Sequence, residues 1–320
     1  MRAIVITRTG GPEVLEASEL PAPEPGPGEV LIDIAAAGVN FIDVYYRTGA
    51  YPQQTPYTPG VEAAGTVAAV GEGVREFSVG DRVAWANVQG GYAEKAVVPA
   101  DKVVPVPGGV SLEDAAASLL QGMTAHYLTR STYPVQEGDT VLVHAAAGGM
   151  GLLLTQAAVA LGARVIATAS TPQKEKLARN VGAAATMGYD GFPERVRELT
   201  DGEGVAVVYD GVGAPTFDGS LESLRRRGTL ALYGAAGGPV PPVDPQRLNR
   251  AGSVFLTRPS LAHYVEKREE LLERAADVYA WVESGAVKVH VGRRHDLAEA
   301  AAAHADLEAR RSTGKLLLIP

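Results

Sequence analysis

Short apolar runs separated by glycine, proline and aspartate dominate the first third of the chain. Runs of this length that are rich in valine, isoleucine and alanine are typical of β-strands, and segments such as PAPEPGPGE at 21–29 are typical of turns. Almost no helical spacing separates the runs, so the pattern predicts a compact antiparallel barrel-like domain. The expected strands cover residues 3–7, 29–39, 65–71, 81–86 and 93–98.

The pattern changes near residue 111, where a serine and two acidic residues precede apolar helical spacing up to residue 129. This order predicts a helix that is capped at its first turn. From residue 140 strands and helices alternate, which predicts a doubly wound parallel sheet of the Rossmann type. The expected strands are 140–146, 164–170, 185–189, 205–213 and 229–238, and the expected helices are 151–163, 171–183, 191–200 and 217–228.

The last part of the chain predicts one long amphipathic helix over 261–285, then a strand at 287–292, a helix at 296–314 and a strand at 315–320. Because the nucleotide-type unit is complete by about residue 257, we expect this tail to rejoin the first domain. The predicted fold class is α/β, with a β-barrel-type catalytic domain from 1–122 and 258–320 and a Rossmann domain from 123–257.

Composition narrows the classes of function. The chain has 320 residues, a formal net charge of −8 and no cysteine. The acidic balance disfavours a nucleic-acid surface, and the absence of cysteine excludes disulfides, thiolate catalysis and cysteine-ligated metals. The N-terminus is typical of a strand rather than of a signal peptide, and no run approaches the roughly 20 apolar residues of a membrane span. We expect a cytoplasmic protein without membrane or nucleic-acid partners.

The stretch VLVHAAAGGMG at 141–151 lies between an expected strand and an expected helix. Ala146, Gly148 and Gly151 occupy the three glycine positions of the G-x-G-x-x-G dinucleotide fingerprint. Gly148 would let backbone N–H groups approach a pyrophosphate, and Gly151 would allow close packing of helix on strand. The alternative is a turn whose glycines serve only steric needs, but the full strand–turn–helix–strand context favours dinucleotide binding.

An NAD-binding site usually places an acidic residue at the end of the second strand. Here Thr168, Ala169 and Ser170 stand at that place. No carboxylate would repel a 2′-phosphate, the hydroxyls of Ser170 and Thr171 would bind one, and Lys174 would add a positive charge. The sequence therefore favours NADPH as the cofactor. The alternative for Lys174 is that it is an ordinary solvated lysine on a helix.

The chain resembles the quinone oxidoreductases of the zeta-crystallin type, in the zinc-free branch of the medium-chain dehydrogenase/reductase superfamily. The resemblance covers essentially the whole chain, through residues 35–52, 59–74, 80–85, 115–128, 144–170, 207–213 and 307–320. It implies a GroES-like catalytic domain, a Rossmann domain, and a cleft between them that holds cofactor and substrate. It also implies a homodimer joined near residues 234–240.

The resemblance assigns cofactor contacts residue by residue. Asn40 and Thr124 match positions near the nicotinamide and its ribose; Gly148, Gly149, Met150 and Gly151 match the pyrophosphate turn; Ser170, Lys174, Tyr189 and Arg310 match the adenosine-phosphate end; Gly234 and Ala235 end the fifth Rossmann strand. Tyr189 as a loop tyrosine over apolar surface, and Arg310 as a cation suited to a helix C-terminus, are the alternatives.

Zinc-dependent relatives bind their catalytic metal with a cysteine and a Gly-His-Glu motif. This chain has Asn40 and Gly60-Val61-Glu62 at those places, so we expect no metal and interpret Glu62 as a structural carboxylate. Without zinc, a thiol or a Ser/His/Asp set, the cofactor must supply the chemistry.

Quinones suit hydride reduction because the product is aromatic, and activated enones suit it as well. Asn40 is the candidate for orienting the nicotinamide, and Tyr45 for donating a hydrogen bond to the acceptor oxygen. Tyr45 and Tyr46 as a packing pair are the alternative. Asp43 and Arg47 are expected in the same substrate segment, whereas His126 and His144 are given no catalytic role.

We therefore predict a zinc-independent NADPH:quinone oxidoreductase. An NADPH-dependent reductase of α,β-unsaturated ketones, aldehydes or thioesters is the nearest alternative. A thioester reductase would carry a cationic pocket, but Arg225–Arg227 is expected on the solvated face of a Rossmann helix. A non-catalytic, crystallin-like or RNA-binding protein is the alternative from another class, and the acidic composition weighs against it.

Overall fold

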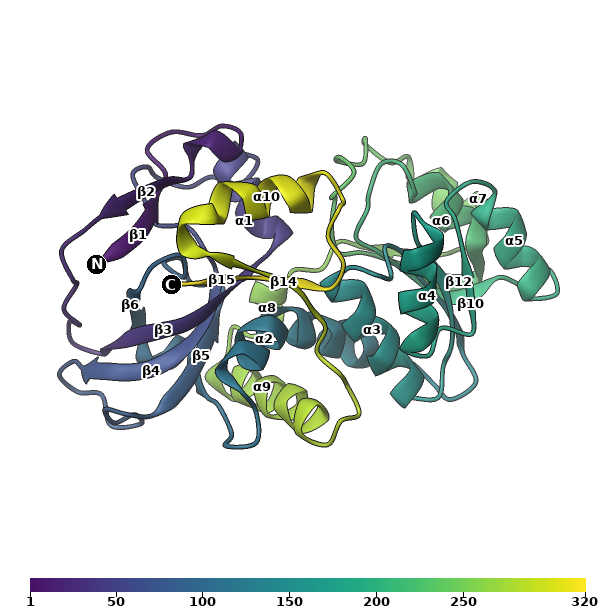
Figure 1. Cartoon of the computed structure of the whole chain (residues 1–320). Helices are drawn as coiled ribbons and strands as arrows, with labels where there is room; N and C mark the ends of the chain where they lie inside the picture. The colour runs from purple at the N-terminus through teal and green to yellow at the C-terminus, as the bar shows by residue number, and fades with distance from the viewer. The chain divides into compact units, whose positions relative to one another are not determined.

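The computed structural model describes residues 1–320 and divides into two compact units (Figure 1). Unit 1 comprises Met1–Met123 and Val265–Pro320, and unit 2 comprises Thr124–Tyr264. The second boundary lies at Tyr264 rather than at residue 257. The short helix α8 (Leu261–Tyr264) belongs to unit 2, because the Tyr264 ring stacks on Tyr127 at 4.1 Å and its hydroxyl lies 3.0 Å from Thr132 Oγ1. None of the helices is both long and apolar enough to cross a lipid bilayer.

Unit 1 is built on a largely antiparallel sheet of seven strands and a separate hairpin of β1 (Arg2–Val5) and β2 (Glu16–Glu19). The tail rejoins this unit as expected, since β15 pairs antiparallel with β3 and Leu317 lies opposite Gly38 (Figure 1). The sheet runs in the order β14 (Val291–Asp296), β15 (Lys315–Ile319), β3 (Glu29–Val39), β4 (Glu62–Val70), β5 (Arg82–Ala86) and β7 (Val103–Pro105), and β6 (Lys95–Pro99) also pairs with β3.

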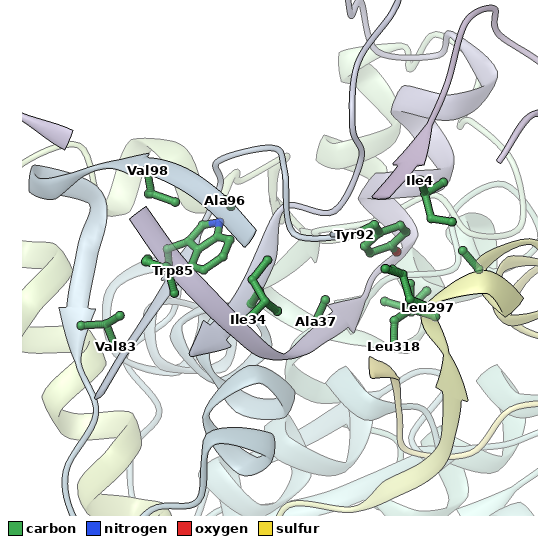
Figure 2. Packing of buried hydrophobic residues seen from close by; sticks show 14 of the residues in the cluster. Ile4, Ile34, Ala37, Val83, Trp85, Tyr92, Ala96, Val98, Leu297 and Leu318 are labelled. Atoms are coloured by element: carbon green, nitrogen blue, oxygen red, sulfur yellow. The ribbon is translucent and has the colours of Figure 1, made fainter. Parts of the chain in front are cut away.

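The core of unit 1 lies against one face of these strands. Val30, Ile32 and Ile34 alternate along β3 and are buried, as the period of two residues in a strand requires. Trp85 on β5 is fully buried near Ile34, and its indole N–H donates to the Val88 carbonyl at 3.0 Å (Figure 2). Burying an apolar side chain of this size contributes roughly 1.5–3 kcal/mol, so this cluster holds the sheet together.

The helices of unit 1 are α1 (Phe41–Thr48), α2 (Leu112–Tyr127, which crosses into unit 2), α9 (Arg268–Glu283) and α10 (Ala300–Glu308); 3-10 turns cover Pro12–Val14, Ala100–Lys102 and Leu297–Glu299. The single helix expected over 261–285 is wrong, because the backbone at Lys267 is extended. Arg268 then donates to the carbonyls of Asp101 and Val103, which anchors the start of α9. The strand expected at 287–292 begins only at Val291.

Unit 2 contains an entirely parallel sheet of six strands. The order is β10 (Ala185–Met187), β9 (Arg164–Thr168), β8 (Thr140–Val143), β11 (Val205–Asp210), β12 (Leu224–Leu232) and β13 (Phe255–Thr257). Numbered within the unit, this is the 3-2-1-4-5-6 order of a Rossmann fold, which confirms the predicted fold class. The helices are α3 (Gly149–Ala160), α4 (Pro172–Asn180), α5 (Phe192–Leu199), α6 (Phe217–Ser223) and α7 (Pro245–Arg250), and a π-helical turn covers Leu128–Thr132.

The position expected for Arg225–Arg227 on a helix is wrong. Helix α6 ends at Ser223, and the three arginines lie near the start of β12. Leu224 pairs with Val205 but Thr229 pairs with Val207, so β12 bulges outward between these two pairs. The helix expected to reach residue 228 cannot continue through the bulge, because Arg227 has a left-handed backbone conformation with a φ of 59°.

Candidate functional site

The glycine turn, residues 144–151, connects β8 to α3 in unit 2. Gly148 is the N-cap of α3, with φ −75° and ψ 167°, and no side chain caps the helix. The N–H groups of the first helical turn have no intrahelical acceptors, and together with the helix dipole they form a donor set for an anion. The turn therefore has the chemistry that a pyrophosphate requires.

The two fingerprint glycines differ in their surroundings. A Cβ on Gly151 would lie 2.4 Å from the Ala145 oxygen and 2.5 Å from the Ala146 Cα, so the start of α3 lies this close to the turn only because Gly151 has no side chain. Gly151 therefore has a steric reason, but the backbone that it approaches is that of the turn rather than that of the strand. A Cβ on Gly148 would meet only the Ala145 oxygen at 3.4 Å, which leaves room beside the turn for a bound group.

Ser170, Lys174 and Tyr189 come after the carboxyl ends of two neighbouring parallel strands, the edge where such sheets bind ligands. Ser170 follows β9 and is exposed, and Lys174 lies on α4. Thr171 caps α4 by accepting from the Lys174 backbone N–H at 3.2 Å. Tyr189 follows β10, and its hydroxyl accepts from the Ala145 N–H at 3.2 Å, which brings it to the glycine turn.

His144 is a buried structural residue, as expected. Its Nδ1 lies 2.8 Å from Thr168 Oγ1, and its Nε2 lies 3.0 Å from Ser220 Oγ. Ser220 donates to Asp210 Oδ2 at 2.9 Å, so His144 Nε2–H donates to Ser220 and Nδ1 accepts from Thr168. Burial lowers the pKa of His144, which keeps the ring neutral. Thr168 thus points inward, Ala169 after it is also buried, and Ser170 is the first exposed residue beyond this strand end.

Asp210, at the end of β11, was missed by the sequence interpretation. Its Oδ1 accepts from the N–H groups of Val212 and Gly213 at 2.8 and 3.0 Å, which fixes the loop after β11. A Cβ on Gly234 would lie 2.7 Å from the Gly211 oxygen, so the loop after β12 packs closely on it. The signal was an aspartate followed by glycines at a strand end, which is typical of a side-chain–backbone turn.

The Asn40 side chain, in unit 1, has all its hydrogen-bonding capacity in use. Its Nδ2 donates to Glu62 Oε2 at 2.8 Å and to the Gly38 carbonyl at 3.2 Å. Its Oδ1 accepts from Lys315 Nζ at 2.7 Å and from Gln121 Nε2 at 3.2 Å. Because an ammonium only donates and a carboxylate only accepts, the orientation of the amide is determined. The predicted contact of Asn40 with a nicotinamide stays a prediction and would be a packing contact.

Glu62 is a structural carboxylate, as the sequence indicated. It is fully buried, and its Oε1 accepts from the Leu120 N–H at 2.7 Å. Its Oε2 lies 2.6 Å from Lys315 Nζ, an ammonium that is itself only 2% exposed. No cluster of three histidine, cysteine or carboxylate side chains with metal-binding geometry occurs in the chain.

Asp43 and Arg47 are 0% and 1% exposed and belong to a buried network of polar side chains, and their expected place in the substrate segment stays a prediction. Arg47 Nη1 lies 3.2 Å from His304 Nδ1, and a guanidinium only donates, so the neutral ring carries its proton on Nε2. Nε2–H then donates to the Tyr92 oxygen, and the Tyr92 hydroxyl donates to Asp43 Oδ2, both at 3.1 Å. Glu308 accepts from Arg47 Nη2 at 2.7 Å at the outer end.

Burial is the largest cause of the pKa shifts of His304 and Asp43 in this network. Burial and the charge of Arg47 lower the pKa of His304 to about 3, so the ring is neutral. Burial raises the pKa of Asp43 to about 7, while two backbone N–H groups and the Tyr92 hydroxyl favour the ionised form. Hydrogen bonds from Arg47 on α1 to His304 and Glu308 on α10 therefore connect the two helices, and most of this network is shielded from water.

Tyr45 lies in a group of partly exposed rings that we call the aromatic face: Phe41, Tyr45, Tyr46 and Tyr51. The ring centroid of Tyr45 lies 5.8 Å from that of Phe41 and 5.2 Å from that of Tyr51. Tyr46 meets Tyr51 edge-on at 5.7 Å. Tyr45 and Tyr46 thus both pack against Tyr51. Because the rings are partly exposed, they also offer π-surfaces to a flat ligand.

The remaining candidates divide between the units. Thr124 is the first residue of unit 2 and is 8% exposed. Gly149 and Met150 begin α3, and Ala235 follows Gly234 in the loop after β12. Arg310 lies in unit 1, just beyond α10, in a left-handed conformation with φ 56°. Unit 1 therefore carries Asn40, Tyr45 and Arg310, and unit 2 carries the other predicted contacts.

Comparisons with known proteins identify the family of the chain. The chain matches the family described as "Alcohol dehydrogenase GroES-like domain" over residues 26–108 and that described as "Zinc-binding dehydrogenase" over 149–277. A quinone oxidoreductase of Pseudomonas aeruginosa is 46% identical and covers 97% of each chain. The structures of a mycobacterial protein and of the Escherichia coli quinone oxidoreductase, both complexed with NADPH, are 56% and 42% identical, each with a TM-score of 0.98 over 100% of both chains. The chain therefore belongs to the quinone oxidoreductase family of the medium-chain dehydrogenase/reductase superfamily.

Proposed function

We propose that this protein reduces quinones with electrons from NADPH and without zinc. The observation that carries the proposal is the uncapped glycine turn, followed by a second strand that ends without a carboxylate. The two relatives complexed with NADPH support the choice of cofactor, and the family relatives support the choice of acceptor. NADPH, when bound, supplies the hydride.

The residues of unit 2 have distinct tasks in this proposal. The N–H groups of the first turn of α3 would hold the pyrophosphate, with Gly148 leaving the space for it. Ser170 and Lys174 would bind the 2′-phosphate through a hydroxyl and a positive charge. Thr124, Tyr189, Gly234 and Ala235 are proposed as further contacts along the cofactor, and Arg310 is proposed as a contact from unit 1.

The residues of unit 1 would position the acceptor. The aromatic face presents flat rings, and we propose that Tyr45 donates its hydroxyl proton in a hydrogen bond to a quinone oxygen. Asn40 has no hydrogen-bonding capacity to spare, so its proposed task is to hold the start of α1 in place. The donor chemistry supports the proposed zinc independence, because Glu62 is bonded to Lys315 and the chain has no cysteine.

Lys174→Ala is expected to raise the Kd for NADPH about tenfold, an effect of roughly 1.4 kcal/mol, because a cation facing the 2′-phosphate is lost. The Kd for NADH should stay the same, since NADH lacks that phosphate. Fluorescence titration of both cofactors measures the difference. Lys176→Ala, at an exposed position of the same helix, is the matched control. Equal changes for both cofactors would overturn the assignment of Lys174.

The test of the function is steady-state oxidation of NADPH and of NADH, in parallel, with a para-quinone and with a simple enone. Turnover of NADPH with the quinone, and much less with the enone, is the expected result. Turnover of the enone with little quinone activity would replace the proposal by a reductase of α,β-unsaturated carbonyl compounds. Tight NADPH binding without turnover of either acceptor would contradict both enzymatic functions.

The homodimer and the cytoplasmic location also stay proposals. Support for the dimer comes from β13, which is the edge strand of the parallel sheet and carries Phe255 at 62% exposure. An apolar side chain on an unpaired edge is suited to pairing with the same edge of a second copy. Light scattering after size-exclusion chromatography should give twice the chain mass of 33.3 kDa, and a mass of 33.3 kDa would contradict the dimer.

A further inference from the structure

Lys315 and Glu62 form an ion pair in the interior of unit 1, which we call the Lys315–Glu62 pair. The two side chains are 2% and 0% exposed, and they come from β15 and β4, the strands on either side of β3. The space between them comes from Gly38 on β3, where a Cβ would lie 2.3 Å from Glu62 Oε2 and 2.8 Å from Lys315 Cε. Three strands are therefore adapted to accommodate two charges.

Stability does not explain this arrangement. Removing two charges from water costs free energy that their mutual attraction repays only in part, and an apolar pair of the same volume is often as stable. The Trp85 and Ile34 side chains show that the same sheet holds an apolar core elsewhere. The role of the Lys315–Glu62 pair is therefore better inferred from the side chain to which both of its members are hydrogen-bonded.

The pair holds Asn40 from both sides of its amide. Lys315 Nζ donates to Asn40 Oδ1 at 2.7 Å, and Asn40 Nδ2 donates to Glu62 Oε2 at 2.8 Å. Both bonds involve an ionised partner, which makes them stronger than bonds between neutral groups. Asn40 precedes α1 as its N-cap, and its backbone N–H donates to Asp43 Oδ2 at 2.9 Å. The orientation of the first turn of α1 thus depends on the pair.

Helix α1 also carries the aromatic face. Phe41 is its first residue and Tyr45 lies one turn further on the same helix. A shift of its N-terminus would move both rings, and misplacement by about 1 Å is enough to slow a positioned reaction strongly.

We propose that Lys315 is a positioning residue of the quinone reduction, acting through Asn40 on the placement of α1 and its aromatic face. The proposal rests on the proposed function and assigns Lys315 no contact with cofactor or acceptor. Glu62 neutralises the ammonium and completes the orientation of the Asn40 amide.

Three variants separate positioning from stability: Lys315→Met, Glu62→Gln and the double variant E62Q/K315M. Each single variant leaves one buried group without its partner, so the melting temperature should fall. The double variant removes both charges of the Lys315–Glu62 pair and should recover the melting temperature. If Lys315 positions Asn40, the double variant still loses about ten- to a hundredfold in kcat/KM for the quinone, the range of one charge-assisted hydrogen bond, with the Kd for NADPH unchanged. Recovery of kcat/KM together with the melting temperature would overturn the proposal.

A second readout does not depend on turnover. Hydrogen exchange of the Asn40 side-chain amide, followed by NMR, should be slow in the native protein and faster in the double variant. Unchanged exchange would overturn the proposal. A native protein that does not turn over quinone at all would instead contradict the proposed function, while exchange still shows whether Lys315 fixes Asn40. Lys95→Met, which breaks a partly exposed ion pair with Asp33 on the same sheet, is the control and should leave kcat/KM and exchange unchanged.

Discussion

Replacing Gly151 by alanine is expected to prevent NADPH binding and to destabilise the protein by about 1–3 kcal/mol, the usual cost of overpacking. The new Cβ would collide with backbone atoms, the Ala145 oxygen at 2.4 Å and the Ala146 Cα at 2.5 Å. Backbone cannot rotate away as a flexible side chain does, so the start of α3 would have to move away from the turn. The N–H donors at the start of α3 would move with it. Denaturant unfolding and a fluorescence titration with NADPH measure the two effects.

Gly148→Ala is the matched substitution for this prediction. Its φ of −75° and ψ of 167° suit alanine, and the added Cβ would meet only one oxygen, at 3.4 Å. The free energy of unfolding should therefore stay close to the native value, while NADPH binding weakens because the methyl group enters the proposed pyrophosphate space. The interpretation of the glycine turn fails if Gly151→Ala binds NADPH as tightly as the native protein does.

Replacing Arg47 by methionine is expected to lower the free energy of unfolding by about 2–3 kcal/mol. The guanidinium is 1% exposed and donates to His304 Nδ1, to Glu308 Oε1 and to the Gly10 carbonyl. Methionine fills much of the volume but donates nothing, so buried acceptors lose their partner. The cost stays below that of a fully buried pair because the Glu308 side chain is 32% exposed and reaches water.

Denaturant unfolding measures this effect, and Arg195→Met provides the control. Arg195 pairs with Glu198 on the surface of α5, with the side chains 57% and 63% exposed. An exposed pair is screened by solvent, so its loss should cause no measurable change. Equal stability of the Arg47 and Arg195 variants would show that the buried network of polar side chains does not stabilise α1.

Elements with a strong local pattern were predicted well. The apolar run ending in VLV, the glycine turn and the apolar helix after it occur in the structure as β8, the turn and α3. The return of the tail as β15 was also confirmed, since a short apolar strand must pair with a sheet. Errors occurred where the local pattern conflicted with tertiary contacts, as at Lys267 between α8 and α9 and at the bulge of Arg225–Arg227.

The candidate site was predicted unevenly for a similar reason. Gly151 could be interpreted from sequence because its neighbours, Ala145 and Ala146, lie in the same turn. The role of Asn40 could not be interpreted in this way, because Lys315 lies 275 residues away and its partner Glu62 lies 22 residues away. Nothing next to a single lysine in the closing strand shows that it will be buried on a carboxylate.

By itself, the sequence of this protein determined the fold class, the dinucleotide-type turn and the absence of an acidic residue after β9. Each of these depends on residues that are neighbours in the chain, so periodicity and spacing carry the information. Only the tertiary structure decided that Asp43 and Arg47 point inward, that His304 is a neutral link to Tyr92, and that two buried charges orient Asn40. Those facts depend on which distant polar groups meet away from water, where each must find a partner, and that is settled only when the strands and helices pack.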